Sequence, residues 1–116
     1  MVDLEKIKKE LRSFAKERDW EQFHDPKNLS MALSVEVAEL VEIFQWSKNG
    51  GLDEIKDPGT KEAIEKEIAD IFNYLLKLVD LMDIDLEKVT LEKIEENAKK
   101  YPIDKSHGKS DKYHKL

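Results

Sequence analysis

The chain has 116 residues and contains no cysteine, four glycines and three prolines. The absence of cysteine excludes disulfides, thiolate metal ligands and thiol nucleophiles, so any bound metal must take oxygen or histidine ligands. Turns depend on glycine and proline, whereas helix interiors avoid both, so their scarcity predicts a largely helical chain.

Long apolar segments are also missing. The first residues lack the apolar core of a signal peptide, and no uninterrupted apolar run approaches the roughly 18 residues that a transmembrane helix requires. We therefore expect a cytoplasmic protein without a membrane partner.

Basic residues are fewer than acidic ones. There are 20 lysines and arginines against 26 aspartates and glutamates, which gives a formal net charge of −6. Proteins that bind nucleic-acid polymers usually present a basic surface, so this balance argues against such a partner. The segment 102–116 differs because its lysines outnumber its aspartates. It is either a solvated, disordered end or a basic flap over an anionic ligand.

Glycine and proline divide the chain into four segments with helical character. In the first, Leu4, Ile7, Leu11 and Phe14 repeat at the spacing of an amphipathic helix. The predicted helices span about residues 3–18, 27–46, 60–82 and 86–101.

Helix-start signals and short connections support this division. Asp25 and Asp85 stand where N-capping residues are expected, just before the second and fourth helices. We predict an all-α, four-helix bundle-like domain over residues 1–101, followed by the basic tail 102–116.

Acidic residues occur on the apolar faces of two of these helices. On a helical wheel of about 100° per residue, Glu36 and Glu39 fall within the apolar stripe of the second helix, and Glu67 and Asp70 within that of the third. The i, i+3 spacing of each pair directs both side chains the same way. The pattern therefore predicts four carboxylates that converge on one site.

Carboxylates in such positions need compensating charge, because burying an ionised group without a partner is costly. The second helix contains no basic residue between Lys27 and Lys48. An oxygen-only ligand set favours Mg²⁺, with Mn²⁺ as a second possibility. The alternative is that these acids flank the core and reach solvent.

A di-iron carboxylate site is disfavoured by the spacing of glutamate and histidine. Such sites take Glu-x-x-His motifs from two helices. This chain has one such motif, from Glu21 to His24, and it lies before the second helix rather than within one.

Magnesium held by carboxylates typically meets a phosphorylated substrate, so the predicted chemistry is attack by water at phosphorus. A carboxylate that is not fully engaged with the metal would orient or deprotonate that water. Trp20, His24 and Trp46 flank the second helix; they are either a wall on which a nucleobase stacks or ordinary packing residues. Lys93 and Asn97 share a face of the fourth helix and either contact phosphate or sugar or lie on a plain surface.

Three motifs together resemble a known family. They are Arg18-Asp19-Trp20-Glu21-Gln22-Phe23-His24, Glu36-Val37-Ala38-Glu39-Leu40 and Phe44-Gln45-Trp46. From about Leu11 to Tyr113 the chain resembles the MazG-like all-α nucleoside triphosphate pyrophosphohydrolases, and within them the dCTP pyrophosphatases.

The resemblance implies a reaction and a site. The reaction would convert a nucleoside triphosphate, a deoxycytidine or modified pyrimidine nucleotide in particular, to the monophosphate and pyrophosphate, in a homo-oligomer that is a dimer or a tetramer. By the same resemblance Glu36, Glu39, Glu67 and Asp70 would bind Mg²⁺ and serve catalysis. The nucleotide would be bound by Trp20, His24, Trp46, Tyr74, Lys93, Asn97, Tyr101 and Lys112.

The chain departs from the family pattern in two places. Leu11 stands where the mammalian members carry a histidine near the base, and the loop from Ser47 to Gly59 is shorter. A non-catalytic helical module that binds nucleotides or mediates oligomerisation is the alternative function.

Overall fold

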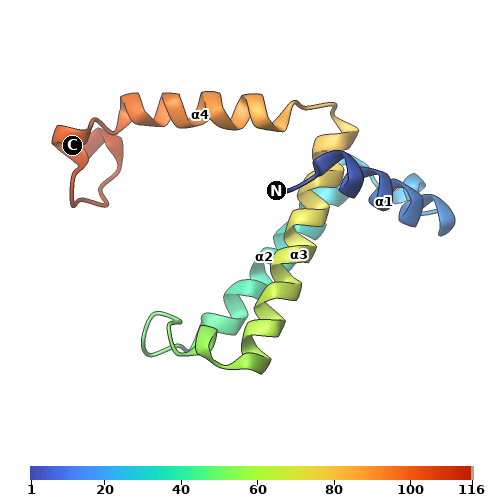
Figure 1. Cartoon of the computed structure of the whole chain (residues 1–116), viewed down its shortest axis with the longest axis horizontal. Coiled ribbons are helices and arrows are strands. Elements are labelled where there is room, and N and C mark those ends of the chain that lie inside the picture. The colour runs from blue at the N-terminus through green and yellow to red at the C-terminus, as the bar shows by residue number, and fades with distance from the viewer. Residues whose placement is uncertain (116) are drawn as a thin grey trace. The chain divides into compact units, whose positions relative to one another are not determined.

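The computed structural model describes residues 1–115, except for the side chain of Tyr113; Leu116, the last residue of the predicted tail, lies outside the described residues. The chain divides into two compact units, residues 1–83 and 84–116. The first contains helices α1 (Leu4–Glu17), α2 (Pro26–Phe44) and α3 (Pro58–Leu81), with 3₁₀ turns at Glu21–Phe23 and Glu54–Lys56 (Figure 1). The second contains α4 (Leu86–Lys100), the short α5 (Ile103–Ser106) and a 3₁₀ turn at Tyr113–Lys115.

The all-α prediction is confirmed, since residues 1–115 form helices, turns and loops without a strand. The four predicted helices are present close to their expected bounds, whereas α5, within the predicted tail, was not expected. The division into a domain of residues 1–101 and a tail from 102 stays a prediction. Within the described part of the chain, no helix combines the length and the apolar character needed to cross a membrane.

Each long helix begins after an aspartate that caps it. The side chain of this aspartate accepts a hydrogen bond from a backbone N–H in the first turn, which satisfies a donor that the helix itself leaves unpaired. The two predicted caps, Asp25 and Asp85, are confirmed. The four cap contacts are Asp3 with Lys6 (3.1 Å), Asp25 with Asn28 (2.7 Å), Asp57 with Thr60 (2.9 Å) and Asp85 with Lys88 (3.2 Å).

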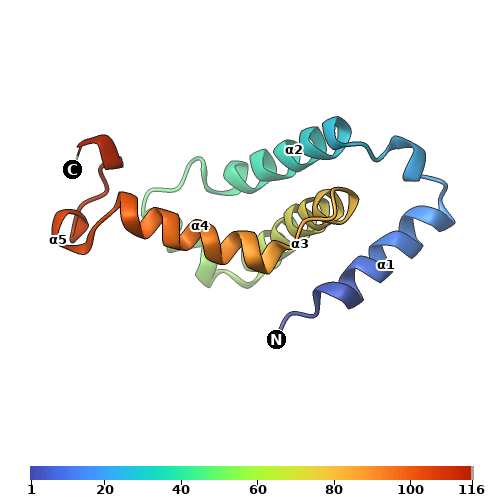
Figure 2. The same ribbon diagram turned by 90° about the horizontal axis from the view of Figure 1, so that it is seen from above.

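The core of the first unit lies where α2 and α3 pack side by side, as both views show (Figures 1 and 2). Leu29 of α2 is buried there, and α3 contributes the buried side chains of Ile64, Leu76 and Val79. Leu76 is 1% exposed. This pairing matters for the site because it brings together the two helices that carry the acidic pairs.

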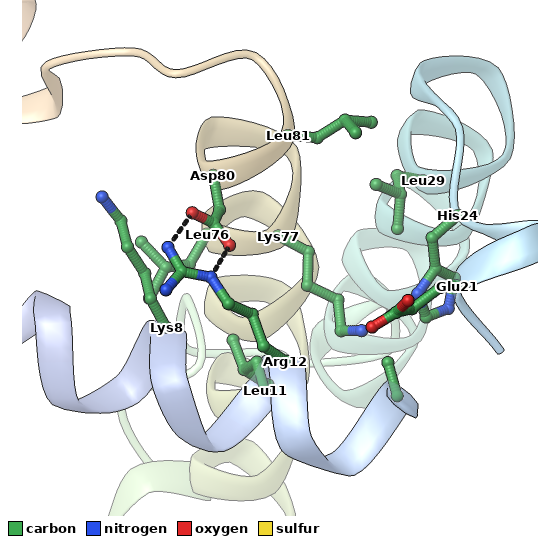
Figure 3. Close-up of a pocket in the computed structure, with 11 residues that line it drawn as sticks. Lys8, Leu11, Arg12, Glu21, His24, Leu29, Leu76, Lys77, Asp80 and Leu81 are labelled. Carbon is green, nitrogen blue, oxygen red and sulfur yellow. Dashed lines mark hydrogen bonds and ion pairs between the residues drawn. The ribbon is translucent and has the colours of Figure 1, made fainter. Parts of the chain in front are cut away.

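A bidentate ion pair connects helix α1 with the C-terminal part of α3. Nε of Arg12 donates to Oδ2 of Asp80 at 2.7 Å, and Nη2 of Arg12 donates to Oδ1 (Figure 3). The Arg12 guanidinium holds the pKa of the Asp80 carboxyl below its ordinary value of 3.8. Parallel hydrogen bonds of this kind fix orientation as well as distance, so α1 is held beside the end of α3.

Replacing Asp80 by asparagine tests the contribution of this ion pair to stability. Because the folded-state pKa of Asp80 is lowered, the pair stabilises the fold at neutral pH, and the stabilisation is lost as the pH falls through that pKa. We expect Asp80→Asn to lower the free energy of unfolding by about 1 kcal/mol at pH 7. Urea unfolding of wild type and variant at pH 7 and at acidic pH measures this difference in the free energy of unfolding.

The matched control is Glu62→Gln, which removes an exposed ion pair with Lys66 on the same helix. Such pairs contribute about 0.3–0.5 kcal/mol. Equal losses for the two variants would contradict the role given to Asp80.

Candidate functional site

Three carboxylates from α2 and α3 come together in the first unit. Glu36 of α2 and Glu67 and Asp70 of α3 each place one carboxylate oxygen so that these oxygens all lie within 4.8 Å of one another. Glu36 and Glu67 are half-buried between the helices, and Asp70 is exposed. The i, i+3 spacing of Glu67 and Asp70 puts both on the side of α3 that meets α2.

Crowding changes the acidity of Glu36. Burial, hydrogen bonding with the carboxyls of Glu67 and Glu39 and repulsion from the charges of Glu39 and Asp70 raise its pKa from 4.5 to about 7. Glu39 is exposed and lies outside the group of three oxygens, but it is close enough to act on Glu36. In the absence of a cation, Glu36 is therefore about half protonated at pH 7.

Two oxygens of the cluster lack a hydrogen-bond donor. Oε2 of Glu36 and Oε2 of Glu67 are buried, and neither finds a donor among residues 1–115. Buried acceptors are rarely left in this state unless an ion or water satisfies them. An oxygen-only set with unsatisfied buried oxygens fits a hard divalent cation such as Mg²⁺ or Mn²⁺.

A pocket of about 440 Å³ adjoins the acidic cluster and shares Asp70 with it. The pocket brings together Trp20, His24 and Tyr74, three residues that the family resemblance assigned to nucleotide binding. Its other lining residues are Glu10, Leu11, Phe14, Asn73 and Lys77. One face of α3 therefore carries an acid of the cluster at Asp70 and a pocket residue one turn later at Tyr74.

Trp20 owes its position to the way α1 ends. Asp19 adopts a left-handed conformation (φ 54°), and the N–H of Trp20 donates back to the carbonyl of Ala15 at 2.9 Å. This turn ends the helix and sets the Trp20 ring edge-on against Phe14, with the ring centroids 5.7 Å apart. Trp20 keeps 45% of its surface exposed, so much of the ring is available to a ligand.

His24 and Lys77 contact each other on the pocket wall. Nζ of Lys77 lies 3.0 Å from Nδ1 of His24, and Figure 3 shows the two side chains converging. Burial and the charge of Lys77 lower the pKa of His24, and burial lowers the pKa of Lys77. A second pocket has a volume of about 260 Å³, and Leu11, His24 and Lys77 line both pockets.

Asn73 and Lys77 line the pocket although neither was predicted to be a site residue. Lys77 follows Tyr74 by three residues and Asp70 by seven, and this helical spacing could have placed it on the same face. A lysine near the edge of an apolar stripe normally extends into water, so the spacing alone did not suggest a half-buried contact with histidine.

The structure does not bring Trp46 into this pocket. Trp46 is 85% exposed and follows the C-terminal end of α2, whereas His24 precedes the N-terminal end. A 19-residue helix spans about 28 Å at roughly 1.5 Å per residue. Within one chain, the two tryptophans therefore stand at opposite ends of α2.

The remaining residues assigned to nucleotide binding lie in the second unit. Lys93 and Asn97 line a shallow pocket on α4, together with Val89, Thr90 and Ile94. Tyr101 is half-buried after the end of α4, and Lys112 is exposed. Their role on the phosphate and sugar side stays a prediction.

Comparison with known proteins identifies the family. The sequence model of the MazG-like family matches residues 31–116, which include all four predicted metal-binding acids. The chain belongs to the MazG-like family. This confirms the resemblance found in the sequence motifs.

Named relatives of this MazG-like chain are similar over most of its length. It is 40% identical to human dCTP pyrophosphatase 1 over 114 residues, covering 97% of this chain and 67% of the relative. It is 39% identical to the rat protein of the same name over 111 residues, covering 95% of this chain and 65% of the relative. The chain thus spans slightly less than two thirds of the rat relative's length.

A solved structure shares the fold as well as the sequence. The crystal structure of a pyrophosphatase from Archaeoglobus fulgidus superposes with a TM-score of 0.79 at 39% identity. The match covers 88% of this chain and 94% of that one.

The raised pKa of Glu36 predicts an unusual dependence of stability on pH. A folded-state pKa of about 7, against 4.5 ordinarily, means that the folded protein binds this proton more tightly than the unfolded chain. Without metal, the free energy of unfolding should therefore fall as the pH rises from about 4.5 through 7. Denaturant unfolding in EDTA across this range measures it.

Glu36→Gln should flatten this dependence and make the metal-free protein more stable above pH 7. Glu65→Gln, an exposed position on α3, is the matched control and should retain the wild-type slope. Identical curves of unfolding free energy against pH for wild type and Glu36→Gln would show that the pKa of Glu36 is not raised in the folded protein.

Proposed function

We propose that this MazG-like chain is a metal-dependent nucleotide pyrophosphohydrolase. It would convert a nucleoside triphosphate and water to the nucleoside monophosphate and pyrophosphate. The observation that carries the proposal is the sharing of Asp70 between the carboxylate cluster and the aromatic pocket. A nucleotide with its base in that pocket would have its phosphates close to the acids.

The proposed metal ligands are Glu36, Glu67 and Asp70, with Glu39 as a fourth, and the proposed ion is Mg²⁺, with Mn²⁺ as a substitute. When bound, the ion would neutralise the charge of the phosphates and of the acids around it. The crowding of these carboxylates, together with their buried oxygens that lack donors, supports this assignment.

The chain's own acids would also handle the proton of the attacking water. Glu39 is exposed and outside the three-oxygen group, so of the four acids it would be the least engaged with the ion, and we assign to it the role of accepting that proton. A bond would form between the water oxygen and the α-phosphorus, the bond from that phosphorus to the bridging oxygen would break, and pyrophosphate would leave.

The proposed substrate is a deoxynucleoside triphosphate, dCTP or a modified pyrimidine in particular. The exposed surface of Trp20 would stack on the base, and Tyr74 and His24 would line the rest of the pocket. The names of the human and rat relatives support a cytosine nucleotide.

We propose that the active form is a homo-oligomer, a dimer or a tetramer. Trp46 can join the pocket of Trp20 only if a second copy supplies it, because α2 separates the two within one chain. Exposed apolar side chains on α2 and α3, among them Val37, Val41 and Ile68, support such an assembly. The cytoplasmic location stays a prediction.

A pyrophosphate-release assay tests the activity. The wild type is incubated with each of the common ribonucleoside and deoxyribonucleoside triphosphates and with 5-modified dCTPs, in Mg²⁺ and in EDTA. We expect release that requires Mg²⁺ and is strongest with a cytosine nucleotide.

Two variants locate the activity in the cluster. Glu67→Gln and Asp70→Asn should each reduce turnover by at least about 10- to 100-fold, the loss commonly seen even when groups supporting a metal ligand are removed. Glu62→Gln changes an exposed residue that precedes Glu67 by five positions on α3, and it should leave turnover unchanged. A wild type that binds nucleotides without releasing pyrophosphate would instead favour the non-catalytic binding module.

A further inference from the structure

The loop between α2 and α3, green in Figure 1, is tied to the end of α2 through Ser47. The N–H of Ser47 donates to the carbonyl of Phe44 at 2.9 Å. Its hydroxyl accepts a hydrogen bond from the N–H of Gly51 at 2.6 Å and donates to Oε2 of Glu54 at 3.2 Å. A hydroxyl has one donor and two acceptor sites, so it can make both bonds at once. Ser47 therefore connects the end of α2 with two later points of the loop.

Gly51 brings the backbone of this loop into direct contact with α2. Gly51 is buried, and a Cβ atom at this position would lie only 2.7 Å from a ring carbon of Phe44. Its φ of 86° lies in the left-handed region, which glycine adopts without strain. The loop backbone thus packs on the Phe44 ring at the same residue that the Ser47 hydroxyl binds.

Trp46 belongs to this ordered stretch of backbone. Phe44 precedes it by two residues and Ser47 follows it directly, and both of these neighbours contact the loop. Trp46 itself is exposed. A large aromatic ring on a backbone that is already ordered loses less conformational freedom when it binds, so such a residue suits a contact with a partner. The hydrogen bonds of Ser47 hold the backbone that carries this ring.

We propose that Ser47 is a positioning residue for Trp46. By holding the loop against α2, its hydroxyl fixes the backbone that presents Trp46 to the Trp20 pocket of a second copy. The inference rests on the proposed function, in which that pocket binds the base and a second copy supplies Trp46. It adds the statement that the hydroxyl of Ser47 affects nucleotide binding through Trp46.

Three substitutions of serine test the hydroxyl. Ser47→Ala removes both of its hydrogen bonds, whereas Ser47→Thr retains a hydroxyl. Ser30→Ala is the matched control, because the exposed hydroxyl of Ser30, also on α2, donates to the carbonyl of Lys27 within the same helix. We expect Ser47→Ala to weaken nucleotide binding by about three- to tenfold, and Ser47→Thr and Ser30→Ala to stay near wild type.

The measured quantity is the dissociation constant of a nucleoside monophosphate in Mg²⁺, determined by calorimetry. The monophosphate is the one derived from the best substrate of the pyrophosphate-release panel, or dCMP if no triphosphate is hydrolysed. This measurement does not require turnover.

A double-mutant cycle separates positioning from a general structural role. Ser47→Ala is compared with wild type and again in a Trp46→Ala background. The cycle uses kcat/KM, which can be measured even where the substrate does not saturate the enzyme. If Ser47 acts through Trp46, Ser47→Ala should lower kcat/KM by less than about twofold once Trp46 is absent. A general structural role would give the same loss in both backgrounds.

The possible outcomes separate this inference from the proposed function. A wild type that binds dCMP but releases no pyrophosphate refutes the proposed function, and dissociation constants then complete the cycle. Wild-type affinity in Ser47→Ala, equal losses in both backgrounds, or a wild type that binds no nucleotide overturns the role of Ser47. If Ser47→Ala does not fold, Glu54→Ala, which removes the acceptor of the hydroxyl, takes its place in the cycle, and the same results overturn the role.

Discussion

Repulsion among carboxylates at the α2–α3 interface is the constraint on which the site depends. Three of them place oxygens within 4.8 Å of one another, and two buried oxygens lack donors among the described residues. Helix packing imposes this crowding, because the hydrophobic contacts that hold α2 against α3 also bring the acids together. A divalent cation would relieve this repulsion. The relief would contribute to the free energy of metal binding.

Helix α3 connects the chemistry with recognition. Asp70, Tyr74 and Lys77 follow one another along one face, from the acidic cluster to the wall of the aromatic pocket. The ion pair between Arg12 and Asp80 holds α1 beside this face, and the turn that ends α1 sets Trp20 at the pocket. The pocket therefore takes its shape from contacts that lie beyond the acids themselves.

The sequence predicts what depends on local periodicity. Apolar spacing and capping aspartates located the long helices, and the same spacing placed Glu36, Glu67 and Asp70 on facing surfaces. Periodicity gives the face of a residue but not its position relative to other elements. For this reason it does not predict that Trp46 lies outside the pocket that contains Trp20 within one chain, or that Lys77 contacts His24.

On the proposed function, we claim that a divalent cation takes the place of a proton in the carboxylate cluster. Calorimetric titration of Mg²⁺ or Mn²⁺ into the protein, in buffers of different ionisation enthalpy, measures the protons released per ion bound. With the pKa of Glu36 at about 7, we expect binding at pH 7 to release about half a proton, and this release to diminish as the pH rises to 8 and beyond. Absence of binding, or binding with the same proton release at every pH, would contradict the claim.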